Sequence, residues 1–139
     1  MRVNEFDTET RHAQELHYRA GLVTGDYKLE AREVIAKAKD LRVSVLTVGP
    51  GQCVPWHHHS EVTDTVFCIE GPMQVETRSP DSEQILTPGN TTAIAPGQPH
   101  RVSGVDGDRC KFLIIQGVGN YDYIPETDDE VSLDLNEKT

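Results

Sequence analysis

The chain has 139 residues, a formal net charge of −10, eight prolines and three cysteines. This length predicts one domain with a hydrophobic core of its own. Because the sequence contains no basic patch and no apolar run of membrane-spanning length, neither nucleic acid nor a membrane is expected as a partner. The odd number of cysteines and the absence of an apolar signal segment in Met1–Thr10 favour a reduced, cytoplasmic protein.

The first fifty residues give the weakest pattern. Met1–Gly25 mixes charged and scattered apolar residues without a firm period. Tyr27–Asp40 is compatible with a helix that has one apolar face or with a strand. Arg42–Val48 alternates as a strand does, and Gly49-Pro50-Gly51 predicts the turn that ends it.

From Gln52 onward, short runs of β-forming residues alternate with breaks that contain glycine and proline. Strands of this length and spacing predict an all-β sandwich or barrel, and the prolines argue against a helical body. The predicted strands are Cys53–His59, Thr63–Glu70, Met73–Arg78, Glu83–Leu86, Thr91–Ala95, His100–Ser103 and Cys110–Gly117.

The C-terminal end is strongly acidic. Residues 122–139 contain seven acids and one base. With few apolar residues to bury, residues 126–139 are predicted to be a mobile tail that follows a single domain at residues 1–125. The alternation of Val131, Leu133 and Leu135 leaves an additional strand open.

Three consecutive histidines, His57-His58-His59, lie in the middle of the chain. On a strand, His57 and His59 point to one face and His58 to the other. Their Cα atoms are then about 6.5–7 Å apart, which lets both imidazoles reach one metal ion. The run therefore predicts half of a metal site.

These residues belong to a longer pattern: Gly51, five residues, His57-His58-His59, four residues, Asp64, six residues, Gly71. The pattern resembles the first motif of the cupin superfamily, over residues 51–71. Residues 88–104, with Gly89, the Pro96-Gly97 turn and His100, resemble the second cupin motif. The resemblance implies a double-stranded β-helix (a jelly-roll barrel), a single metal ion inside the barrel and commonly a homodimer.

The resemblance has departures. Asp64 stands where the family has Glu, so its side chain is one methylene shorter. Asn90, Ala95 and Gly104 replace an Asp, a Pro and an Asn of the second motif, and are expected to affect turns more than chemistry.

Carried over residue by residue, the family's metal ligands become His57, His59, Asp64 and His100. Three imidazoles and one carboxylate suit a divalent transition metal such as Zn, Fe, Mn, Ni or Co. With Asp64 too short to reach, the site would keep three histidines and water, and Glu61 is a second candidate carboxylate. His58 is expected to face outward.

The pocket is expected to be lined by Cys68 and Val66, which share the Asp64 face of their strand, and by Trp56 beside a ligand. Tyr121 and Tyr123 are expected either at the barrel mouth or at a dimer seam.

Two functions remain open at this stage. One is an enzyme acting on a small molecule, in which the metal acts as a Lewis acid or activates dioxygen. The other is a non-catalytic small-molecule-binding or sensing protein. Because Arg78 and Arg101 are the only cations close to the motifs in sequence, a neutral or aromatic substrate is expected.

Overall fold

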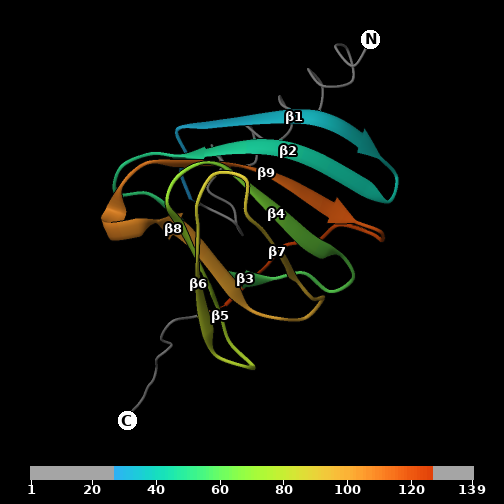
Figure 1. The fold of residues 1–139 in the computed structure, drawn as a ribbon. Helices are drawn as coiled ribbons and strands as arrows, with labels where there is room; N and C mark the ends of the chain where they lie inside the picture. Colours follow the sequence, from blue (N-terminus) through green and yellow to red (C-terminus); the bar gives the residue numbers. More distant parts are fainter. Residues whose placement is uncertain (1–26, 127–139) are drawn as a thin grey trace.

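The computed structural model describes residues 27–126 as two packed β-sheets (Figure 1). The strand order is β1-β2-β9-β4-β7 in one sheet and β10-β3-β8-β5-β6 in the other, and neighbouring strands are antiparallel. The described residues contain no α-helix, so the all-β jelly-roll prediction is confirmed. The elements are β1 (Ala31–Ala38), β2 (Leu41–Val48), β3 (Cys53–His58), β4 (Thr63–Glu70), β5 (Met73–Thr77), β6 (Ser82–Leu86), β7 (Thr91–Ile94), β8 (His100–Gly104), the 3-10 helix η1 (Val105–Gly107), β9 (Cys110–Gly117) and β10 (Ile124–Pro125).

Strand β1 resolves the ambiguity of Tyr27–Asp40 in favour of a strand. It lies at the edge of its sheet and pairs only with β2. Val34 is its one buried residue, so the strand needs no alternation of apolar and polar residues. Its weak sequence signal follows from its edge position.

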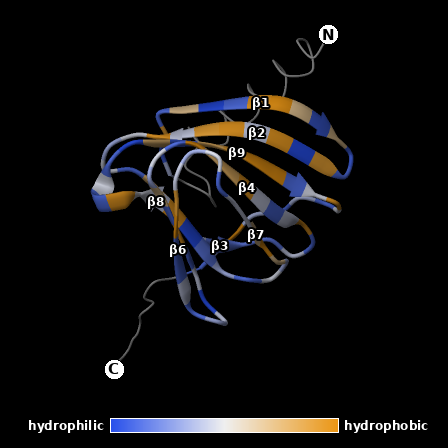
Figure 2. Cartoon of the chain, viewed as in Figure 1, coloured by the Kyte–Doolittle hydropathy of each residue, from blue (hydrophilic) through white to orange (hydrophobic). Residues whose placement is uncertain are grey.

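The hydrophobic core lies between the two sheets. Val48, Val66, Cys68, Met73 and Cys110 are fully buried there, contributed by four different strands. In Figure 2, β2 and β9 are largely orange, whereas the tip of the β5–β6 hairpin is blue to white. The inward faces of the strands therefore supply the core, as their alternation predicts.

Strand β3 contains a register shift against β8. Val54 lies opposite Val102 but His57 lies opposite His100, so β3 has one extra residue between the two pairs. Pro55 lies at this position and has no N–H to donate to the ladder, which suits a β-bulge. Because of the extra residue, Val54 and His57 are both buried although they are an odd number of positions apart.

Gly104 explains one departure from the cupin motif. A Cβ atom at this position would lie 1.7 Å from the carbonyl oxygen of Asp108. Only glycine fits where the chain returns from η1, so this replacement serves the backbone path, as expected from the sequence.

The segment after β9 folds back along β3. Ile124 and Pro125 pair with His58 and His57, and the N–H of Glu126 donates to the carbonyl of Trp56 over 2.9 Å. The predictions for Met1–Gly25 and for the Val131–Leu135 alternation concern residues outside the described ones. Within residues 27–126, no helix has the length and apolar character that crossing a membrane requires.

Candidate metal centre

Four predicted ligands meet at one end of the barrel interior. His57 lies on β3, His59 directly after it, Asp64 on β4 and His100 at the start of β8. All four are at most 3% exposed, and one donor atom from each lies within 4.8 Å of the others. His57 and His100 are cross-strand partners, which is why their rings lie only 4.2 Å apart.

The Nδ1 atoms of the three imidazoles have fixed partners. Nδ1 of His57 donates to the carbonyl of Pro55 over 2.7 Å, and Nδ1 of His100 donates to the carbonyl of Gln98 over 2.9 Å. Nδ1 of His59 lies 2.5 Å from the carbonyl of Asp122. Because a carbonyl oxygen only accepts hydrogen bonds, each Nδ1 carries the proton, and the Nε2 lone pair of the neutral ring is left for a metal.

The spacing of the inward atoms fits a metal ion. Nε2 of His59 lies 3.1 Å from Oδ2 of Asp64, and Nε2 of His100 lies 2.9 Å from the same oxygen. Two ligands that bind an ion at about 2.1 Å and at right angles are about 3.0 Å apart. An imidazole lone pair and a carboxylate oxygen at this distance need a cation between them, either a proton or a metal ion. Three nitrogens and one oxygen form a borderline donor set that suits a divalent first-row metal.

The pKa values show how strongly the four groups interact. Burial, together with the neighbouring His100, lowers the pKa of His57 to about 3. Burial alone would raise the pKa of Asp64, but hydrogen bonds from His100 and His59 hold it well below its ordinary value. Burial would lower the pKa of His59, but its hydrogen bond with Asp64 raises it. The carboxylate is therefore ionised at neutral pH and His57 is neutral, the forms that bind a metal.

The shorter Asp64 side chain reaches the histidines. Its second oxygen, Oδ1, accepts a hydrogen bond from Nε2 of Gln116 over 3.1 Å. Gln116 was not predicted, although a polar residue on the inward face of the otherwise apolar β9 is a readable signal. Glu61 is exposed and accepts a hydrogen bond from the N–H of Asn120 over 3.2 Å, outside the four-residue group.

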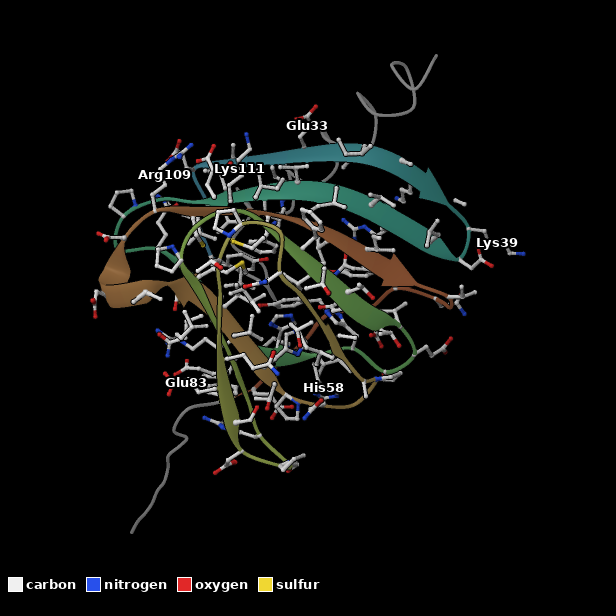
Figure 3. All side chains as sticks on the ribbon, in the orientation of Figure 1. Glu33, Lys39, His58, Glu83, Arg109 and Lys111 are labelled. Carbon is white, nitrogen blue, oxygen red and sulfur yellow. The ribbon has the colours of Figure 1, made fainter. Side chains whose placement is uncertain are left out.

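His58 lies apart from the other two histidines, as predicted. It is the last residue of β3, and Figure 3 labels it near the lower edge of the barrel in that view. Its ring bonds to the carboxylate of Glu126, and it is half-buried while His57 and His59 are buried. The alternation expected for the three histidines is present in the structure.

A cavity of about 20 Å³, about the space of one small ion or water molecule, lies beside the four donors. Tyr121 and Tyr123 close it. The ring of Tyr123 stacks on His57 with centroids 4.5 Å apart, and the ring of Tyr121 lies 5.2 Å from that of His59. Both tyrosines therefore line the metal-site cavity, and their expected part in a dimer seam stays a prediction.

The predicted pocket-lining residues are not the ones that line this cavity. Val66 and Cys68 do face inward, but they lie deeper, in the hydrophobic core. Trp56 directly precedes the inward-facing His57, so alternation along β3 turns it away from the site, and the centroid of its ring lies 3.8 Å from Cζ of Arg78. The cavity is lined by Tyr27, Arg32, Ser44, Leu46, Val54, His57, His59, Asp64, His100, Val102, Phe112, Ile114, Gln116, Tyr121 and Tyr123.

The cations near the site also differ from those expected. Arg101 forms an ion pair with Glu76 at 2.9 Å, and Arg78 lies over Trp56. Arg32 lines the cavity instead, and the guanidinium of Arg42 lies 4.0 Å from the ring of Tyr121. Arg32 belongs to β1 and Arg42 to β2, and the fold brings these two strands to the site from outside the two motifs.

Comparisons with known proteins agree with this fold. A Klebsiella pneumoniae protein with a double-stranded β-helix domain is 21% identical, with a TM-score of 0.60, covering 79% of this chain and 95% of that one. A cupin-2 domain protein from Shewanella frigidimarina is 22% identical, with a TM-score of 0.53 and coverages of 72% and 89%. An oxalate decarboxylase is 17% identical, with a TM-score of 0.59, and the match covers 68% of this chain but only 27% of the decarboxylase.

These identities support a shared fold and nothing narrower. No curated protein matches the sequence. The family described as Cupin domain matches residues 44–116, which is more than half of the chain and includes all four donors. The chain belongs to the cupin family.

Proposed function

We propose that this cupin is a metal-dependent enzyme that acts on a small organic molecule at His57, His59, Asp64 and His100. The observation that carries the proposal is the fixed tautomer of all three imidazoles. Each Nδ1 is held by a backbone carbonyl, so each ring is oriented before any ion binds. Such a preformed, buried donor set beside a cavity is typical of a catalytic metal site.

A bound divalent ion such as Zn, Fe, Mn or Ni would act there as a Lewis acid or, if redox-active, in dioxygen chemistry. The chain's own residues hold and shield the site. Gln116 fixes the orientation of the Asp64 carboxylate. Burial raises the pKa of Tyr121 well above its ordinary value, so its phenol stays protonated and can donate a hydrogen bond. Together with Tyr123 it limits the access of bulk water.

The test begins with elemental analysis of the purified protein. We expect about one divalent transition metal ion per chain. The metal-free protein is then reloaded with zinc, iron, manganese or nickel, and each form is assayed with a panel of small organic molecules for substrate loss and oxygen uptake. Turnover with zinc would indicate Lewis-acid chemistry, whereas oxygen uptake with iron or manganese alone would indicate dioxygen chemistry.

Two results would contradict the proposal. A wild-type protein that binds none of these metals would remove the metal site. A protein that binds metal and ligand but turns over no compound would support the non-catalytic binding or sensing alternative. The His58→Ala variant is the matched control, because its ring lies outside the site and its metal content should stay at the wild-type level.

The expected homodimer stays a prediction, and one surface suits it. On the outer face of the first sheet, Val45 lies opposite Leu113 and Leu113 lies opposite Phe67. Phe67 is 41% exposed, as is unusual for a large aromatic side chain on a sheet. We expect wild-type protein to sediment as a dimer and Phe67→Lys to sediment as a monomer; a monomeric wild type would refute the prediction.

A further inference from the structure

A polar row crosses the inner face of the first sheet. Arg42 on β2 lies opposite Gln116 on β9, and Gln116 lies opposite Asp64 on β4. All three side chains are buried, with exposures of 8%, 8% and 1%. Directly opposed residues in an antiparallel pair share a face, so the row leads from a metal donor to Arg42.

Two polar groups at the β2 end of this row lack hydrogen-bond partners. Ser44 lies two residues along β2 from Arg42, is 2% exposed and lines the cavity. Neither Oγ of Ser44 nor Nε of Arg42 has a hydrogen-bond partner within residues 27–126. Because buried polar groups are nearly always paired in proteins, two such groups on the same face of β2 point to a bound ligand as their partner.

Arg42 packs against Tyr121, with Cζ of its guanidinium 4.0 Å from the centroid of the ring. A contact with an aromatic ring does not satisfy the N–H groups that lie in the plane of a guanidinium. Packing against Tyr121 therefore explains where Arg42 lies but leaves its Nε–H without a partner among the described residues.

The charges around the cavity favour an anion. Asp64 is the one buried acid among the described residues, and its oxygens are bonded to His59, His100 and Gln116. A divalent ion at the site would outweigh this single negative charge. Arg42 and the cavity-lining Arg32 add two more positive charges. A buried surplus of positive charge is unfavourable until an anion compensates it.

We propose that the small molecule bound at this site is a carboxylic acid whose carboxylate group lies on the β2 side of the cavity, against Ser44 and Arg42. The inference rests on the proposed function and names its substrate class. A guanidinium edge and a hydroxyl group match the in-plane lone pairs of a carboxylate. Arg32, which lines the cavity, contributes a further positive charge. This class replaces the neutral or aromatic substrate expected from the motifs alone.

The test uses protein loaded with Co²⁺, whose visible absorption reports changes at the metal site. The protein is titrated with acetate and with its neutral counterpart, acetamide. We expect acetate to bind about tenfold more tightly than acetamide. Arg42→Gln should weaken acetate binding by about tenfold, and Ser44→Ala by a smaller factor, because a charged donor contributes more than a hydroxyl. Arg42→Lys, which keeps the charge but not the fork, should lie between wild type and Arg42→Gln.

Arg78→Gln is the matched control. Arg78 also stacks on an aromatic ring, at 3.8 Å from that of Trp56, but outside the site, so acetate affinity should not change. Wild-type acetate affinity in both Arg42→Gln and Ser44→Ala would overturn the inference. If Arg42→Gln fails to fold, the acetate affinities of Arg42→Lys and Ser44→Ala test the inference instead.

The two readouts separate this inference from the proposed function. Cobalt content tests the metal site, whereas acetate affinity tests the anion site. If wild-type protein took up no cobalt, the proposed function would fail. The acetate-dependent rise in melting temperature of the same proteins would then still show whether Arg42 and Ser44 bind a carboxylate, and an equal rise in wild type and both variants would refute it.

Discussion

The two ends of the barrel interior are built from the same strands but differ in chemistry. One end is apolar and closely packed, with Met73, Cys68 and Cys110 fully buried. The other end holds the polar row and the four donors. The inward residues change from apolar to polar along each strand, from Cys110 to Gln116 on β9, from Cys68 to Asp64 on β4 and from Val48 to Arg42 on β2.

The difference separates stability from function within one small domain. Burial of apolar side chains stabilises the folded state by about 25 cal/mol per Å² of apolar surface, and the apolar end is where these side chains are buried. Polar groups at the other end cost free energy to bury unless they are paired or bind a ligand. Changes at the two ends should therefore have distinct effects, on metal binding at one end and on unfolding at the other.

The largest expected effect is at the polar end. His57→Ala, His59→Ala and His100→Ala should each remove most of the bound metal, because each deletes one of few ligands. Asp64→Ala should retain an intermediate amount, since three imidazoles still bind the ion. Elemental analysis of each variant measures this. A His58→Ala variant without metal, beside a His57→Ala variant with full metal, would show that the ligand set is wrong.

The apolar end should respond in stability. Met73→Ala should lower the free energy of unfolding by about 2–5 kcal/mol, because it leaves a cavity in the core away from the metal site. Urea denaturation followed by circular dichroism measures the loss. Ile85→Ala on the neighbouring strand β6 is the control, since Ile85 is 51% exposed and should change stability by about 1 kcal/mol or less. Similar losses in both variants would contradict the assignment of the core.

Lowering the pH should decrease the free energy of unfolding of the metal-free protein, and His57 should account for part of the decrease. Burial lowers the pKa of His57 to about 3, whereas the unfolded chain binds a proton at about 6.5. The stability that this neutral ring contributes is therefore complete above about pH 6.5 and decreases as the pH falls, by about 2 kcal/mol between about pH 7 and about pH 5.

The measurement compares the free energy of unfolding of metal-free wild type and His57→Gln at the two pH values. His59 works in the opposite direction, because its hydrogen bond with Asp64 raises its pKa. The difference between the two proteins isolates His57, and a wild type that loses no more stability than His57→Gln would contradict the prediction.

The smallest effect concerns the thiols. Cys68 and Cys110 are fully buried at the apolar end, and burial raises the pKa of Cys110 to about 12. Cys53 is half-buried. Because the thiolate is the reactive form, iodoacetamide should modify Cys53 alone in the native protein and all three cysteines in denaturant. Mass spectrometry of the labelled peptides gives the answer, and native labelling of Cys110 would show that the apolar end opens readily.

The sequence predicts the fold and the ligand set through features that are local in the chain. Strand alternation and Gly/Pro breaks predict the β-barrel, and two motifs with fixed spacing name the four donors that the structure brings together. Trp56 was expected to line the pocket because it stands beside a ligand in the sequence, but it lies outside the cavity and packs against Arg78. The register shift between Val54 and His57 was not predicted, because no alternation along the chain reveals it.

The remaining site residues come from parts of the chain that only the fold brings together. Arg32 on β1 lines the cavity, Arg42 on β2 contacts the cavity-lining Tyr121, and both precede the first motif, whereas Gln116 and Tyr121 follow the second. Because these residues are distant in sequence from the histidines, no local motif includes them. A polar residue on an inward strand position, as with Arg42 and Gln116, is the one signal that could have found them.

The bulge at Pro55 changes which residues of β3 face the barrel interior. Before it, even-numbered residues such as Val54 face inward, and after it odd-numbered ones such as His57 and His59 do. Deleting Pro55 or Trp56 would remove the extra residue and place Val54 and His57 two positions apart, so that ordinary alternation would keep both facing inward and His57 opposite His100. The bulge therefore leaves the inward direction of His57 unchanged and adds one residue of chain between the core residue Val54 and the first donor of the metal site.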